Sequence, residues 1–262
     1  MSGFEDGQRP SPAMMPRRRA VIPPAQRPPA MSTFKVAAMI PRRGIPGAVA
    51  WADTGVLLGL GTDKDLLDRF RLQYTGRIRI AKTVAVELQF HSDRDITGLP
   101  DDAYDRVASA TAAINSLLVG PDCLLPIGVG NEDLPEVARI AQQLKALSED
   151  KTKRHGGEAE IIVLAAKHAR LDGRVHVLLT NDGGASVIAD QHRLPSRHVG
   201  DVLAEFACGS PALAPGACRT AFTAAVRLSA PPAHSRQSRV ADFTCVMTAS
   251  GCAPCDGQAD IS

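Results

Sequence analysis

Three short strand-like segments, each leading into a helical pattern, constrain the fold of this chain more than any other feature. They are residues 47–52 (GAVAWA), 77–81 (RIRIA) and 175–180 (VHVLLT), and the last has the composition of a fully buried strand. Strands that alternate with helices predict right-handed crossovers and a mostly parallel sheet. The fold class expected is therefore α/β, a three-layer α/β/α sandwich with helices on both faces of the sheet.

Helical spacing of apolar residues fills the segments between these strands, and residues 123–127 could add one further short strand. The helices are expected over residues 54–73, 83–91, 102–118, 133–147, 157–171, 182–191 and 200–206.

Proline marks the boundaries of the expected domain. Residues 1–46 hold roughly half of the chain's prolines, mixed with arginine, and predict a disordered Pro/Arg-rich extension. After residue 207 the pattern decays, so residues 208–262 are expected to be a low-order tail with one short helix near 219–228. The folded domain is placed at 47–207.

Composition excludes some modes of action. Aromatic residues make up only 4% of the 262 residues, which disfavours stacking of bases on aromatic platforms, and a net charge of +2 neither demands nor excludes nucleic acid. No apolar run is long enough for a membrane span, and no apolar region follows the arginines near the N-terminus. Six scattered cysteines fit a reducing compartment, so a cytoplasmic location is expected.

Four acidic residues fall at corresponding places in this pattern. Asp53 ends the first apolar segment, Glu87 lies in the helix after the second, and Asp182 follows the third. Glu158 opens the helix that precedes the third strand. Ligand sites of open parallel sheets form beyond the carboxyl ends of the strands, so these four acids are expected to meet.

Each acid alone also has a structural explanation. Asp53 and Asp182 suit helix N-caps, Glu158 suits the positive end of a helix dipole, and Glu87 needs a partner if it is buried. Carboxylates that converge repel one another unless a cation lies between them. Because the expected ligands are oxygens only, Mg²⁺ is the predicted cofactor, with Mn²⁺ as the alternative.

The four segments WADTGVLLGL, TVAVEL, HGGEAEIIVLAA and LLTNDGGA occur in the order and spacing of a PIN domain. The chain resembles VapC-type toxins and related GEAE-bearing PIN proteins of bacteria over about residues 47–206. The resemblance implies a Mg²⁺- or Mn²⁺-dependent endoribonuclease, the toxin of a type II toxin–antitoxin pair. It also implies an RNA substrate, a cognate antitoxin and a homodimer.

Carried over by position, Asp53, Glu87 and Asp182 match the first, second and fourth acids of the family. Glu158 is taken as the third because Ala165 then stands where the family has a small residue, and Glu160 stays the alternative. Asp53, Glu158 and Asp182 are the expected metal ligands. Three polar residues are expected to support them: Thr54, Thr180 and Asn181.

Two further expectations concern binding. An antitoxin helix is expected in a groove walled by the helices near residues 54–72, and a patch of basic residues is expected to contact phosphates: Arg69, Arg71, Arg77, Arg79, Lys151, Lys153 and Arg154. Of the histidines, only His155 lies near the acids, and it is taken as an ordinary surface or helix-end residue. The alternative function is a non-catalytic PIN-like module that binds RNA or protein.

Overall fold

The computed structural model describes residues 45, 47–95, 97–98, 100–148, 155–207, 215–229, 247–248 and 251–252. All of them belong to the unit Ala37–Ser262. Nearly all of the expected extension 1–46, most of the expected tail and three residues of the basic patch (Lys151, Lys153 and Arg154) lie outside the described residues.

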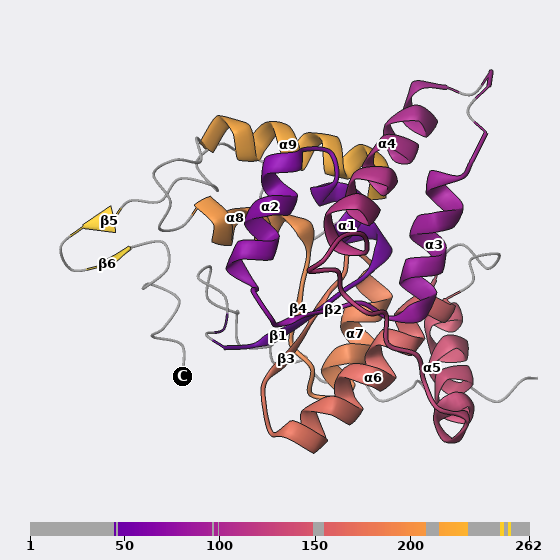
Figure 1. Ribbon diagram of the computed structural model, residues 1–262. Coiled ribbons are helices and arrows are strands. Elements are labelled where there is room, and N and C mark those ends of the chain that lie inside the picture. Colours follow the sequence, from indigo (N-terminus) through magenta and orange to yellow (C-terminus); the bar gives the residue numbers. More distant parts are fainter. Residues whose placement is uncertain are drawn as a thin grey trace, which may run out of the picture. The chain divides into compact units, whose positions relative to one another are not determined.

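A parallel sheet of four short strands lies at the centre of the fold (Figure 1). Its strand order is β2-β1-β3-β4, and every neighbouring pair is parallel. The strands are β1 (Val49–Ala52), β2 (Ile78–Arg79), β3 (His176–Leu179) and β4 (Ser196–Arg197). The expected α/β class with a parallel sheet is confirmed.

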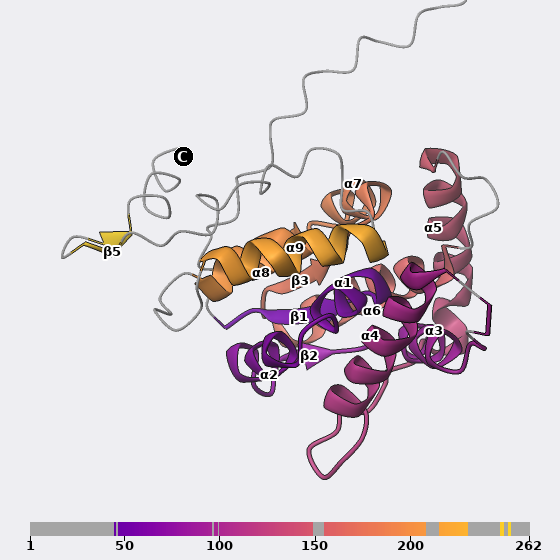
Figure 2. The same cartoon turned by 90° about the horizontal axis from the view of Figure 1, so that it is seen from above.

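Helices cover both faces of the sheet and complete a three-layer α/β/α sandwich. One layer holds α1 (Thr54–Leu60), α2 (Lys64–Gln73), α4 (Asp101–Leu117), α8 (Val199–Ala207) and α9 (Pro215–Ser229). The other holds α5 (Leu134–Leu147), α6 (Gly156–Asp172) and α7 (Gly183–Gln191). Helix α3 (Lys82–Ser92) contacts both α4 and α6 (Figures 1 and 2).

The core lies between the sheet and these helices. All four residues of β1 and all four of β3 are buried, as central strands of a parallel sheet covered on both faces must be. Helix α6 contributes a run of small and branched side chains that are also buried, from Ala159 to Ala166. Its alanines allow the helix to lie close against β1 and β3.

Two segments differ from the sequence-based expectation. Residues 123–127 form no strand, and only Ile127 makes an isolated bridge, to Ala81. Pro126 lacks an amide hydrogen for a ladder, and Leu125 beside it points into solvent. Strand β4 was not expected, because its two residues, Ser196 and Arg197, are too few to produce an alternating pattern.

Helix α9 is longer than the helix expected near residues 219–228, and it packs on the domain (Figure 2). Four of its side chains join the hydrophobic core: Cys218, Ala221, Phe222 and Ala225. The contact with α1 is close, since a Cβ atom placed on Gly59 would lie 2.9 Å from that of Ala225. Together with α4, α9 therefore covers the part of the expected antitoxin groove that α1 would have formed.

None of the helices in the described part of the chain combines the length and the apolarity that a membrane crossing requires. Near the C-terminal end, the described residues form a two-stranded antiparallel pair, β5 (Met247–Thr248) and β6 (Gly251–Cys252).

Candidate metal centre

Asp53 follows β1 directly, and its backbone amide and both carboxylate oxygens make hydrogen bonds. Its backbone N–H donates to the Leu179 carbonyl at 2.9 Å, which continues the β1–β3 ladder past the end of the strand. One carboxylate oxygen accepts from the Val56 amide at 2.9 Å and so caps α1. The other accepts from the hydroxyl of Thr180. The N-cap explanation for Asp53 therefore holds, and it uses one of the two oxygens.

Asp182 lies three residues past the end of β3 and begins the next helix. Its Oδ1 accepts from the Ala185 amide at 2.9 Å, which caps α7. Its backbone N–H donates to Thr180 Oγ1 at 3.0 Å. The single hydroxyl of Thr180, buried with no exposed surface, thus connects the two aspartates.

Glu87 reaches the same region from α3. Its carboxylate accepts from the hydroxyl of Thr54, the residue after Asp53, and it lies against Gly157 at the start of α6. A Cβ atom at Gly157 would lie 2.9 Å from Glu87 Oε1. Glycine at this position is therefore what allows the start of α6 to approach the carboxylate.

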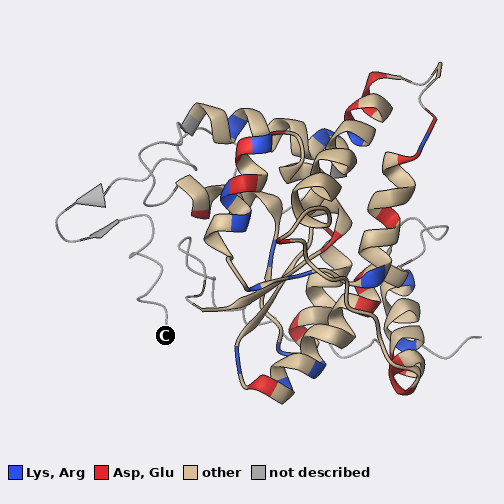
Figure 3. Cartoon of the chain, viewed as in Figure 1, with Lys and Arg blue, Asp and Glu red and all other residues tan. Residues whose placement is uncertain are grey.

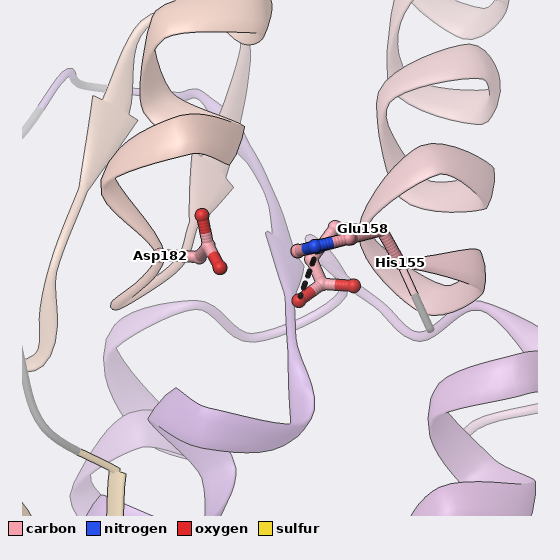
Figure 4. A group of neighbouring side chains, drawn as sticks. All are labelled: His155, Glu158 and Asp182. Atoms are coloured by element: carbon pink, nitrogen blue, oxygen red, sulfur yellow. Dashed lines mark ion pairs between the residues drawn. The ribbon is translucent and has the colours of Figure 1, made fainter. Parts of the chain in front are cut away.

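Glu158 and His155 come from the first turn of α6. His155 is the N-cap residue, and its Nδ1 lies 3.9 Å from Glu158 Oε1. Figure 4 shows both side chains directed toward Asp182, which approaches from the start of α7. One ligand atom each from His155, Glu158 and Asp182 lies within 4.8 Å of the other two.

His155 is a helix-end residue, the N-cap of α6, as one of the two expected alternatives had it, but it does not lie on the surface, since only 4% of it is exposed. Among the described residues, neither of its ring nitrogens has a hydrogen-bond partner. A buried polar group left without a partner costs about 1–3 kcal/mol, which makes this imidazole unusual. The signal that could have identified it is the spacing His155-Gly-Gly-Glu158, which places both side chains on one side of a helix start.

Glu160 points elsewhere, although it lies only two residues after Glu158. It is buried, it accepts from the Thr83 amide at 3.1 Å, and it is also hydrogen-bonded to the backbone of Val129. Burial raises the pKa of its carboxyl above the ordinary value, and these two hydrogen bonds oppose the shift. Glu160 thus accepts a hydrogen bond from the first turn of α3, while Glu158 faces the cluster.

Of the residues expected to support the acids, Thr54 and Thr180 each donate a hydroxyl hydrogen to a carboxylate, as described above. Asn181 does something different. Its Oδ1 accepts from the Val199 amide at 2.9 Å, so it caps the start of α8. Thr54 and Thr180 therefore support the acids, whereas Asn181 supports the start of α8.

The donor set fits a divalent cation. Two of the three expected ligands, Glu158 and Asp182, belong to the group within 4.8 Å, and His155 is its third member. Asp53 is not part of that group among the described residues but is linked to Asp182 through Thr180. Donors around one ion at about 2.0–2.2 Å lie roughly 3–4 Å apart, so small side-chain rotations suffice to bring these together.

The two aspartates follow neighbouring strands, and the glutamates come from α3 and α6, two helices that contact each other. Such convergence at the carboxyl edge of a parallel sheet is where open α/β folds bind ligands. No family model, no curated protein and no solved structure matches the chain. A function for it can therefore be argued only from the geometry of this site.

Proposed function

We propose that this chain is a cytoplasmic, metal-dependent endoribonuclease of the PIN type that hydrolyses RNA phosphodiester bonds. The observation that carries the proposal is the meeting of Asp53, Glu87, Glu158 and Asp182 at one edge of the sheet. Four carboxylates brought together by two threonines and a glycine exceed what helix capping requires.

The residues that would hold the cation, Mg²⁺ or Mn²⁺, are Glu158 and Asp182 together with His155. When bound, such an ion lowers the pKa of a coordinated water and neutralises charge on a phosphodiester. Thr180 holds the Asp53 carboxylate toward this group, and the cap to Val56 prevents it from rotating away. The site thus needs no side-chain nucleophile.

Glu87 has the role of a positioning acid. The Thr54 hydroxyl fixes one of its oxygens, and the other lies beside Gly157, one residue before Glu158. A carboxylate held in this way can accept a hydrogen bond from the attacking water and orient it toward the phosphorus atom.

Contacts to the RNA backbone would come from basic residues near the site, and two members of the expected patch also bind backbone carbonyls. Arg77 donates to the carbonyls of Ala48 and Gln73, and Arg79 donates to those of Gly76 and Ile78. Lys and Arg residues, blue in Figure 3, are spread over several helices. Among the described residues, exposed Lys82, the first residue of α3, follows β2 on the side of the sheet where the acids lie and is a candidate contact for a phosphate.

The test replaces one metal-binding oxygen without removing a helix cap. Asp182→Asn keeps the cap of α7, because asparagine caps as well as aspartate does. We expect cleavage of total RNA in Mg²⁺ or Mn²⁺ to fall by at least about a hundredfold, because changes beyond the ligands already cost about 10–100-fold. The matched control is Asp63→Asn, the same change at the exposed N-cap of α2, which should cleave at the wild-type rate.

Equal cleavage by wild type and Asp182→Asn would refute the nuclease assignment. RNA binding without any metal-dependent cleavage by the wild type would favour the non-catalytic binding module instead. The toxin assignment adds that the product of an adjacent reading frame suppresses cleavage. A rate that this product leaves unchanged would remove the toxin–antitoxin pairing and leave the nuclease.

A further inference from the structure

Among the described residues, the imidazole of His155 is the buried group at the candidate metal centre whose polar atoms have no hydrogen-bond partner. Its side chain is 1% exposed, and neither ring nitrogen has a hydrogen-bond partner among the described residues. His176, which is equally buried, accepts at Nδ1 from the Trp51 indole and contacts Asp172 through Nε2. A buried histidine in this fold can thus have hydrogen-bond partners at both ring nitrogens, whereas His155 has none among the described residues.

Among the described residues, two carboxylates lie near the ring of His155. Its Nδ1 lies 3.9 Å from Glu158 Oε1, which is too long for a hydrogen bond, and Asp182 faces the same space (Figure 4). An unbonded nitrogen lone pair and two carboxylates around one space form a donor set for a metal ion. Loop geometry does not create this arrangement, because His155 and Asp182 begin two different helices.

We infer that His155 is a metal ligand and that the centre selects Mn²⁺ over Mg²⁺. The inference rests on the proposed function only for the role that the bound ion plays, since the ligands are argued from the structure. Mg²⁺ takes oxygen ligands almost exclusively, whereas imidazole nitrogen binds first-row transition ions. One imidazole and two carboxylates therefore favour Mn²⁺, which accepts both kinds of donor.

His155→Gln tests the inference through metal binding alone, with no RNA present. Glutamine keeps a side chain of similar size but replaces the nitrogen ligand with an amide oxygen, which Mg²⁺ accepts. By calorimetry, we expect the Mn²⁺ affinity of the variant to fall by about tenfold or more while the Mg²⁺ affinity is retained. The matched control, His192→Gln at the other end of α7, should leave both affinities unchanged.

A second measurement needs no variant. Pulsed electron paramagnetic resonance of Mn²⁺ bound to the wild type should detect a directly coordinated ¹⁴N nucleus, and the signal should be lost in His155→Gln. Absence of ¹⁴N coupling in the wild type would overturn the inference, as would an unchanged ratio of Mn²⁺ to Mg²⁺ affinity in the variant.

These results are separable from the fate of the proposed function. Nitrogen-coordinated Mn²⁺ in a protein that cleaves no RNA would uphold the ligand and refute the nuclease. Metal-dependent cleavage with no nitrogen coupling to Mn²⁺ would uphold the nuclease and overturn His155 as a ligand.

Discussion

At the scale of single residues, hydroxyl groups and ring nitrogens determine what the acidic and aromatic side chains of this protein can do. Trp51 and His176 illustrate this in the core. The indole N–H of Trp51 donates to His176 Nδ1 at 2.8 Å, so the neutral ring carries its proton on Nε2, which faces Asp172 at 3.1 Å. Protonation at Nδ1 would place two donors against each other.

This pair predicts that stability falls in mild acid. Burial lowers the pKa of His176 below its ordinary 6.5, so the unfolded chain binds the proton more readily. The stabilisation is complete above about pH 6.5 and is lost as the pH falls toward the folded-state pKa. Burial also lowers the pKa of His91 and His192, which adds to the effect in the same direction.

The measurement is urea unfolding between pH 7.5 and 5, followed by the fluorescence of Trp51, the only tryptophan in the chain. Each proton contributes a slope of at most about 1.4 kcal/mol per pH unit. His176→Gln should unfold with a shallower pH dependence than the wild type. A wild-type free energy of unfolding that stays flat across this range would contradict the prediction.

Residue types at the ends of the strands could be predicted from the sequence, but their partners could not. Asp53 and Asp182 were located because an acid within three residues of the end of a buried apolar run can be recognised in the sequence alone. The bond from Thr180 to Asp53 joins residues 127 positions apart, and the burial of His155 depends on how α6 approaches the sheet. Neither follows from local spacing.

At the scale of elements, α6 serves two neighbours through two acids that are two residues apart. Side chains at i and i+2 point to different sides of a helix, so Glu158 faces the start of α7 while Glu160 faces the start of α3. The Ala81 N-cap of α3 has no side-chain hydrogen bond of its own. Glu160 therefore supplies from α6 an acceptor that α3 lacks.

The two glutamates should consequently give opposite results when each is replaced by alanine. Glu160→Ala leaves the Thr83 amide without its acceptor, so we expect the metal-free protein to lose about 1–3 kcal/mol of stability. Its Mn²⁺ affinity should be retained. Glu158→Ala should lower Mn²⁺ affinity by about tenfold or more, because Glu158 faces the ion-binding group.

Urea titrations and calorimetry on both variants check this pair of outcomes. Loss of Mn²⁺ binding in Glu160→Ala with no loss of stability would mean that Glu160 is the third acid.

The length of a helix or strand determined whether it could be predicted from the sequence. Long amphipathic helices such as α4 and α5 were located to within about two residues, as is usual for helix boundaries, whereas the two-residue strand β4 had no detectable pattern.

At the scale of the whole molecule, α9 extends the folded unit beyond the boundary that the sequence suggested. The side chains that bury it recur at helical spacing: Cys218, Ala221, Phe222, Ala225 and Leu228. Most of them are small, so the segment shows little contrast between apolar and polar faces. Small residues are nevertheless what the close contact with Gly59 of α1 requires.

If α9 folds together with the rest, a cavity within it must destabilise the whole. Phe222 is 5% exposed, and Phe222→Ala should lower the free energy of unfolding by about 3–5 kcal/mol, detected by Trp51 fluorescence in the sheet. Thr223→Ala, at the adjacent exposed position, is the control and should change it by less than about 0.5 kcal/mol. An unfolding curve that Phe222→Ala leaves unmoved would mean that α9 is not part of the cooperative unit.

The register of β1 on β3 has a consequence for how this site can change over evolution. Ala52 pairs with Leu179, and the next rung joins the Asp53 amide to the Leu179 carbonyl. The next position along β3 is Thr180, whose hydroxyl donates to Asp53 and accepts from the Asp182 amide, so the spacing between neighbouring strands sets the distance from Asp53 to this bridging residue. A slip of one residue would turn the Asp53 side chain to the other face of the sheet and break its hydrogen bond with Thr180. Insertions in the loops of the long helical connection can therefore accumulate without altering the distance between Asp53 and Thr180.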